Sequence, residues 1–186
     1  RVSARYPLIE AWCAAWAVLA WWHTGPSPAL VPELLWGCLL VALTFIDLDF
    51  QVLPHALTVP GIALGLTASL LGDAGWRHAA LGIAVGAGYQ WLFLWVWQRF
   101  MKREGLGFGD VMLGAMFGAL LGPVGAFVTV FVAALAGSLV GAVMMARGQA
   151  GMRTALPFGT FLAPAAMLVH LWGRPAIDAY LSLFRR

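Results

Sequence analysis

Charge is scarce in this sequence of 186 residues, because only 10% of them are Asp, Glu, Lys or Arg. Soluble domains typically carry about 25% charged residues, whereas 62% of the residues here are hydrophobic. One small core cannot bury so many apolar side chains, so most of them must face lipid. The composition excludes a soluble globular domain and predicts an all-α, polytopic transmembrane helical bundle.

Cysteine is also rare. Cys13 and Cys38 lie in apolar stretches 25 positions apart, a spacing that suggests neither a disulfide framework nor a metal cluster. We therefore expect two buried thiols and no metal site. The 11 basic residues outnumber the eight acidic ones, but they fall in short connections rather than on one face, so no nucleic-acid partner is expected.

Apolar runs separated by Gly, Pro and charged residues predict about seven membrane-spanning helices in a single domain of residues 1–186. The expected spans are 8–23, 29–46, 55–72, 78–98, 109–122, 124–146 and 156–173, followed by a short surface helix at 175–186. If the spans alternate in direction, seven Lys and Arg residues lie on one side and four on the other. The positive-inside rule then makes the first side cytoplasmic.

Glycine pairs four residues apart occur on four of the predicted spans. This spacing lets helix backbones approach closely, which is typical of packing inside a membrane bundle. The pairs are Gly61/Gly65, Gly82/Gly86, Gly114/Gly118 and Gly137/Gly141.

Acidic residues at membrane depth are costly, so each one is a candidate functional residue. Most of the eight carboxylates lie in connections or near helix starts, where solvation or the helix dipole explains them. Three remain: Asp47 and Asp49 at the end of the second span, and Asp110 at the start of the fifth. The predicted topology brings Asp47 and Asp110, 63 positions apart, to the same cytoplasmic depth.

Several interpretations of these acids stay open at this point. Two facing carboxylates could form an aspartic-protease dyad, in which one takes a proton from water while the other, protonated, polarises the scissile carbonyl. Alternatively, Asp110 caps a helix and the other two end a span in water, or the acids relay protons or cations in a transporter component. Gly107 and Gly109 favour the dyad, because they permit close backbone approach and unusual torsions that a cap does not require.

Four segments resemble the type IV prepilin peptidases, which are bacterial inner-membrane aspartic proteases of the GxGD class. The segments are RYPLIE at 5–10, FIDLDFQVLP at 45–54, EGLGFGD at 104–110 and LPFG at 156–159. Their order and spacing follow the family over nearly the whole chain. The resemblance implies a GxGD aspartic protease fold in the bacterial inner membrane, surrounded by lipid, with its site facing the cytoplasm.

The resemblance also implies an activity: removal of the short basic leader from prepilins and pseudopilins, for pilus assembly or type II secretion. Asp47 and Asp110 would be the catalytic pair, and Asp49 a neighbour that tunes the site. Further supporting positions would be Pro54, Gly107, Gly109, Pro157 and Gly159. The peptidase reaction needs no cofactor, whereas methylation of the new N-terminus, found in many members, uses S-adenosylmethionine.

The alternative among enzymes is another GxGD membrane peptidase, of the preflagellin or presenilin-like kind. The Leu53-Pro54 step and the Pro157-Phe158-Gly159 segment favour the prepilin branch. The alternative from a different class is a proton- or cation-coupled transporter component, but no internal repeat supports it. The sequence does not predict the oligomeric state.

The chain departs from the family's pattern in three places. The family's N-terminal helix and its cytoplasmic domain with paired Cys-x-x-Cys motifs are missing from this sequence, which makes methyl transfer and a zinc site doubtful for it. His55 stands where the family often has Asp or Asn, and Met112 where it often has Lys or Arg. Neither His55 nor Met112 receives a role from the sequence.

Overall fold

The computed structural model describes residues 5–101, 107–148 and 156–183, without the side chains at 97, 100, 101 and 174–183. These residues form six helices and no strand, which agrees with the predicted all-α class. The sequence predicts about seven spans and a separate surface helix instead of these six helices. The helices are α1 (Arg5–Thr24), α2 (Leu30–Phe50), α3 (His55–Leu71), α4 (Gly75–Met101), α5 (Phe108–Ala146) and α6 (Gly159–Leu183).

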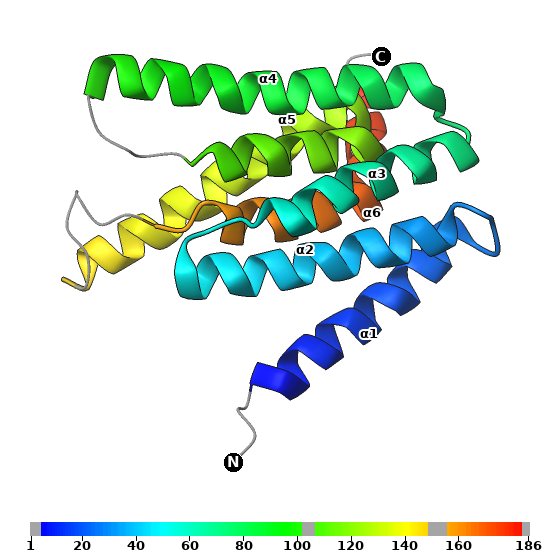
Figure 1. The fold of residues 1–186 in the computed structure, drawn as a ribbon, viewed down its shortest axis with the longest axis horizontal. Coiled ribbons are helices and arrows are strands. Elements are labelled where there is room, and N and C mark those ends of the chain that lie inside the picture. The colour runs from blue at the N-terminus through cyan, green and yellow to red at the C-terminus, as the bar shows by residue number, and fades with distance from the viewer. Residues whose placement is uncertain (1–4, 102–106, 149–155, 184–186) are drawn as a thin grey trace.

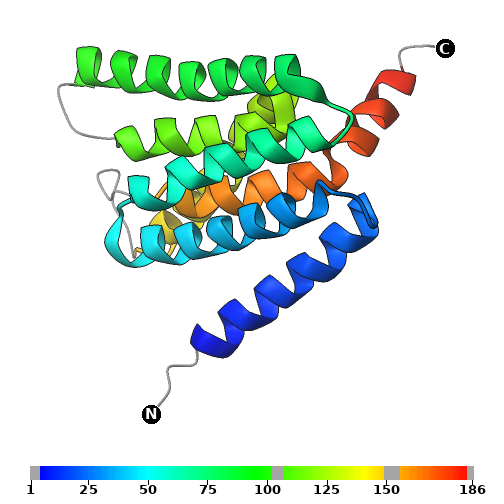
Figure 2. The same ribbon diagram turned by 45° about the vertical axis from the view of Figure 1, so that its right-hand side comes forward.

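Helix α5 is sharply kinked in its middle. Gly122 has φ 70° and ψ −174°, a conformation outside the helical region, and Pro123 follows it. Glycine adopts positive φ without steric cost, and proline cannot donate the next helical hydrogen bond. Figures 1 and 2 show the second half of α5 running back toward the end where the first half begins. The break predicted between 122 and 124 lies at this kink.

Several predicted boundaries differ from the structure, most clearly those of α2 and α6. Helix α2 continues to Phe50 instead of ending at 46, and it stops where Gln51 turns left-handed (φ 52°) three residues before Pro54. The aspartates were read as the end of the span, although polar side chains at a helix end do not interrupt backbone hydrogen bonds. Helix α6 begins at Gly159 rather than 156 and continues through Leu183, so the helix predicted at 175–186 is not separate from it; residues 184–186 lie outside the described residues.

Glycines bring α4 and α5 into backbone contact, as their spacing predicts. A Cβ added at Gly82 would lie 1.9 Å from the carbonyl oxygen of Gly118, and one at Gly86 would lie 2.2 Å from that of Gly114. Real Cβ atoms do not approach other atoms this closely, so any larger residue would force the helices apart.

The other glycine pairs differ from each other. A Cβ at Gly61 would lie 2.4 Å from Met116 Sδ on α5, which again indicates close packing. Added Cβ atoms at Gly137 and Gly141 would meet only side chains, at 3.5 Å and 3.2 Å. The packing role predicted for the last pair therefore does not depend on backbone approach.

The core lies between α2, α5 and α6. Trp36, Leu40, Phe117 and Leu162 are fully buried there, and the Trp36 indole N–H donates a hydrogen bond to the Met116 carbonyl oxygen at 3.2 Å. Helix α1 packs mainly against α2 and stands apart from the other helices at its N-terminal end (Figures 1 and 2).

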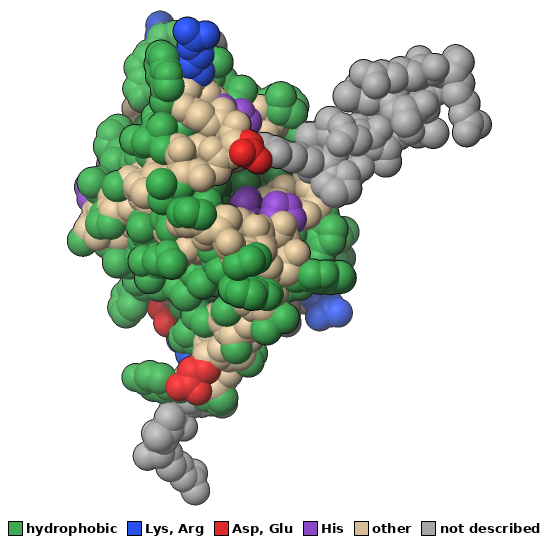
Figure 3. All heavy atoms as spheres, turned by 90° about the vertical axis from the view of Figure 1, so that its right-hand side faces the viewer, with side chains coloured by type: hydrophobic (Ala, Val, Ile, Leu, Met, Phe, Trp, Pro, Cys, Tyr) green, Lys and Arg blue, Asp and Glu red, His purple; other side chains and the backbone are tan. Residues whose placement is uncertain are grey.

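Apolar side chains also cover the outside of the bundle. Three helices of the described part of the chain are long and apolar enough to cross a membrane: Leu30–Phe50, Gly75–Val96 and Phe108–Ala146. Hydrophobic side chains dominate the face drawn in Figure 3, and exposed tryptophans include Trp22, Trp76 and Trp172. A surface of this kind requires lipid, so the chain is a membrane protein.

Candidate active site

Three helix ends meet around a cavity at one end of the bundle. The C-terminal end of α2 and the N-terminal ends of α5 and α6 lie at the left in Figure 1, together with the segment that joins α2 to α3. The cavity between them measures about 660 Å³. Its lining residues are Asp47, Gln51, Val52, Leu53, His55, Gln98, Gly107, Phe108, Gly109, Asp110, Leu156, Pro157 and Phe158.

Asp47 is held by the first residues of α6. It is 5% exposed, and its Oδ2 accepts hydrogen bonds from the Thr160 backbone N–H at 2.7 Å and the Thr160 hydroxyl at 3.1 Å. The first N–H groups of a helix have no partner inside the helix, so Asp47 satisfies a donor that α6 would otherwise leave unpaired.

Gly159 makes this approach possible. A Cβ at Gly159 would lie 2.9 Å from Asp47 Oδ2 and 3.0 Å from Leu53 Cδ1. A larger residue would push α6 away from α2 and lengthen the hydrogen bonds to Asp47. Pro157 lines the cavity just before the helix. Gly159 is thus positioned to support the site, as predicted, because only a residue without a side chain fits there. The direct hydrogen-bond partner of Asp47 is Thr160, which sequence reasoning missed.

Asp110 lies at the N-terminal end of α5 and is 7% exposed. Its Oδ2 accepts a hydrogen bond from the Gly107 N–H at 3.2 Å, so it forms part of a capping box at the third helical position. The N-cap is therefore Gly107 and not Asp110, as the capping interpretation had it, although Asp110 does accept a hydrogen bond from the N-cap N–H. This hydrogen bond does not exclude a role for Asp110 in a dyad. One hydrogen bond occupies only one carboxylate oxygen, and the residue also lines the cavity.

The fold thus brings together the two aspartates predicted to form a pair. Asp47 and Asp110 come from different helices and line the same cavity. Both are mostly buried, yet the cavity contains no Lys or Arg among its described lining residues. Two buried carboxylates on one cavity are the side chains that acid–base cleavage of an amide by an aspartate pair requires.

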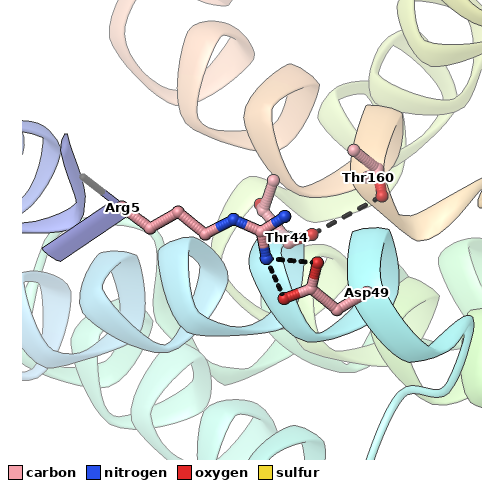
Figure 4. Close-up of polar contacts among 4 residues, drawn as sticks. All are labelled: Arg5, Thr44, Asp49 and Thr160. Atoms are coloured by element: carbon pink, nitrogen blue, oxygen red, sulfur yellow. Dashed lines mark hydrogen bonds and ion pairs between the residues drawn. The ribbon is translucent and has the colours of Figure 1, made fainter. Parts of the chain in front are cut away.

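Asp49 points elsewhere. Both of its carboxylate oxygens lie 2.5 Å from Arg5 Nη1, as Figure 4 shows, and Asp49 is not among the residues that line the cavity. Residues two apart on a helix project about 200° from each other. Asp49 therefore links α1 to α2, outside the cavity.

Figure 4 also shows Thr160 beside Thr44, whose carbonyl oxygen lies 3.5 Å from the Thr160 hydroxyl.

The two predicted glycines before Asp110 have different environments. A Cβ at Gly109 would lie 2.7 Å from Leu53 Cβ, so Gly109 allows the α2–α3 segment to approach α5. At Gly107 the nearest atom would be 3.8 Å away, and its φ of −86° suits any residue. The prediction of unusual backbone torsions at both glycines was wrong, since neither residue has a positive φ. A Cβ at Gly107 would therefore make only ordinary van der Waals contacts, with Gly109 N and Asp110 Oδ2.

The remaining sequence candidates also have definite positions. Pro54 is the N-cap of α3, with φ −65° and ψ 129°, and it ends the turn that follows α2. His55 lines the cavity and contacts Phe108 edge-on, with ring centroids 5.8 Å apart. Met112 is half-buried on α5 and does not line the cavity. Gln51 and Gln98 line it without any sequence signal that could have identified them.

The sequence profile of the type IV leader peptidase family matches residues 34–142, a range that contains both Asp47 and Asp110. The chain belongs to the type IV leader peptidase family. It is 35% identical over 187 residues to a prepilin leader peptidase/N-methyltransferase of Stutzerimonas stutzeri, covering 99% of this chain and 64% of that protein. It is 37% identical over 179 residues to the Pseudomonas putida protein of the same name, covering 93% of this chain and 60% of that protein.

A leader peptidase of Pseudomonas aeruginosa is also similar, at 34% identity over 184 residues, with 97% of this chain and 63% of that protein aligned. The chain thus spans less than two thirds of the length of these curated relatives. No solved structure matches it significantly. Family membership gives the paired aspartates of this chain a chemical context that geometry alone does not supply.

Proposed function

We propose that this chain is a membrane-embedded aspartic endopeptidase that cleaves the basic leader from type IV prepilins or pseudopilins. The observation that supports this best is the placement of Asp47 and Asp110, two buried carboxylates from different helices, on one cavity. The names of its relatives supply the substrate class, and the buried pair supplies the reaction type.

The proposed reaction uses a water molecule between the two carboxylates. One carboxylate takes a proton from the water, whose oxygen adds to the scissile carbonyl, while the other, protonated, donates a hydrogen bond to the carbonyl oxygen. The tetrahedral intermediate then releases the amine, which receives a proton as the C–N bond breaks. No covalent enzyme intermediate forms. In this chain Thr160 orients Asp47, and the Gly107 N–H orients Asp110.

The substrate would bind partly in water and partly against lipid. A prepilin carries a charged leader before an apolar helix, and its scissile bond must be extended to be attacked. Val52 and Phe108 line the cavity and are each 56% exposed, so they offer apolar contacts to the pilin segment. Gly107 is exposed and lines the cavity beside Asp110, so an extended backbone could lie against it.

We further propose the seven crossings and the GxGD arrangement of the resemblance. Helices α1 to α4, the two halves of α5 and then α6 would cross the inner membrane in turn, since α5 reverses direction at Gly122. Arg5, Arg99 and Arg147 then fall at the end that holds the aspartates. The positive-inside rule supports a cytoplasmic site at that end, and the leader would be cut there.

Methyl transfer is the second activity in the relatives' names. S-adenosylmethionine is a cationic sulfonium with a ribose and an amino acid portion, which call for carboxylate and polar partners of their own. The only carboxylates among the described residues of the cavity are Asp47 and Asp110. The described residues therefore do not fit this cofactor alongside proteolysis, and we assign no methylation step to them.

The experiment is cleavage of a leader-plus-helix substrate by the purified chain in detergent, with products mapped by mass spectrometry. We expect a single cut between leader and apolar helix. A folded, cooperatively melting chain that leaves this substrate intact would contradict the proposal. Proton or cation flux in proteoliposomes that is abolished by Asp47→Asn, without any cleavage, would instead indicate a transporter component.

A further inference from the structure

A second polar cluster lies at the other end of the bundle from the aspartates. His23 belongs to the last turn of α1, Glu33 to the first turns of α2, and His170 to α6. Their ligand atoms all lie within 4.8 Å of one another. Glu33 and Asp47 are 14 positions apart on α2, which corresponds to about 21 Å along the helix axis. The cluster is therefore distinct from the candidate active site.

The three residues border a cavity of about 460 Å³. Figure 3 views this end of the molecule and shows histidine side chains in and beside a hollow in an otherwise apolar surface. Among the described lining residues there is no Lys or Arg, whereas Asp73 and Glu33 are both acidic. The cavity thus offers imidazole nitrogens and carboxylate oxygens and no fixed positive charge.

Burial distinguishes this cluster from an ordinary surface group of polar residues. Glu33 is 3% exposed, and its Oε1 lies 2.7 Å from His170 Nε2. A buried carboxylate needs compensation by a cation or by several hydrogen bonds. The Thr24 hydroxyl donates to Oε2 at 2.6 Å, which fixes the carboxylate in the way that outer partners fix metal ligands.

The rings around His170 complete the site. Its centroid lies 4.9 Å from that of His23, 5.8 Å from that of Trp16 and 6.0 Å from that of Trp36. These aromatic rings keep water away from one side of the cluster, while the cavity leaves the other side open. A hydrophobic surround of this kind strengthens coordination by restricting solvent access.

We propose that His23, Glu33 and His170 bind a divalent transition metal ion, with Zn²⁺ as the ion whose preferences fit. Two imidazoles and one carboxylate form a three-ligand set common in zinc proteins, and a water molecule from the cavity completes the tetrahedron. Ligand atoms of a tetrahedral zinc site are about 3.3 Å apart, given bonds of about 2.0–2.1 Å. Glu33 and His170 would separate slightly, and His23 would move inward.

The ion would act as a clamp for α1. Helix α1 packs mainly on α2 and makes few contacts with α6. A metal ion that joins His23 to Glu33 and His170 connects α1, α2 and α6 at one point. Metal binding then stabilises the bundle without taking part in the reaction at the aspartates.

The test is a titration of the purified chain with Zn²⁺, in which calorimetry measures the heat of binding. The chain carries no polyhistidine tag and is first treated with a chelator. We expect one Zn²⁺ per chain, and we expect Co²⁺ to give the visible absorption of a tetrahedral nitrogen and oxygen site. His23→Ala and His170→Ala should each lower the affinity for Zn²⁺ by about 100-fold or more. Mutation of a residue that only hydrogen-bonds to a metal ligand already lowers metal affinity by about 10–100-fold. His55→Ala, at the other end, should bind like the parent.

His23→Ala is the decisive variant because His23 is exposed, and substitutions of exposed side chains usually change stability little. Zn²⁺ should raise the melting temperature of the parent by several degrees and leave that of His23→Ala unchanged. Asp47→Asn should still bind zinc like the parent, since the clamp is independent of proteolysis. Failure of the parent to bind zinc, or equal binding by the parent and His23→Ala, would show that the cluster is only a hydrogen-bonded network.

Discussion

The Thr160 hydroxyl offers a direct test of how Asp47 is positioned. Thr160→Val removes the Oγ1 donor 3.1 Å from Asp47 Oδ2 but keeps the branched shape of the side chain. The Thr160 backbone N–H, 2.7 Å from the same oxygen, remains. A hydrogen bond to a charged group contributes about 1.5–3 kcal/mol, and about 1.36 kcal/mol corresponds to a tenfold change in rate.

We therefore expect Thr160→Val to lower kcat/KM for leader cleavage by about 10- to 100-fold, provided the bond persists in the transition state. The assay is a cleavage time course in detergent at several substrate concentrations, with melting curves to confirm folding. Thr160→Ser is the matched control, because it keeps the hydroxyl and should cleave close to the parent rate. A Val variant as active as the parent, or a Ser variant as impaired as Val, would refute this account of Asp47.

Three further substitutions test helix packing at Gly159 and Gly82 and the position of Asp49 outside the cavity. Gly159→Ala places a Cβ 2.9 Å from Asp47 Oδ2, so cleavage should fall by up to about 100-fold through misplacement; unchanged cleavage would contradict the close approach. Gly82→Ala places a Cβ 1.9 Å from a carbonyl oxygen of α5 and should lower the melting temperature by several degrees. Gly88→Ala, with nothing within 4 Å, is the control for both. Asp49→Asn breaks an exposed ion pair, so unfolding free energy should change by no more than about 1 kcal/mol while cleavage continues; lost cleavage would place Asp49 in the site.

The spans and the aspartate pair could be predicted because their signals are local. Apolar runs bounded by Gly, Pro and charge locate helices, and the Gly122-Pro123 step marks the reversal of α5. Alternation of the spans then puts Asp47 and Asp110 at one depth without any knowledge of packing. The family motifs around both residues add the chemistry.

The partners of these residues could not be predicted in the same way. Thr160 bonds to Asp47 across 113 positions, and His170 meets Glu33 across 137. In a membrane bundle both the buried and the lipid-facing sides of a helix are apolar, so hydrophobic periodicity does not show which way a helix is rotated. Contacts between helices that depend on rotation, including the histidine cluster, therefore become visible only in the structure.

The most direct measurement compares leader cleavage by the parent chain, Asp47→Asn, Asp110→Asn and the double variant, all shown to be folded. Residues that act as one unit are not additive, so loss of either should cost about as much as loss of both. We predict that all three variants fall to the same residual rate. Cleavage at the parent rate by either single variant would contradict the aspartate pair as the site of catalysis.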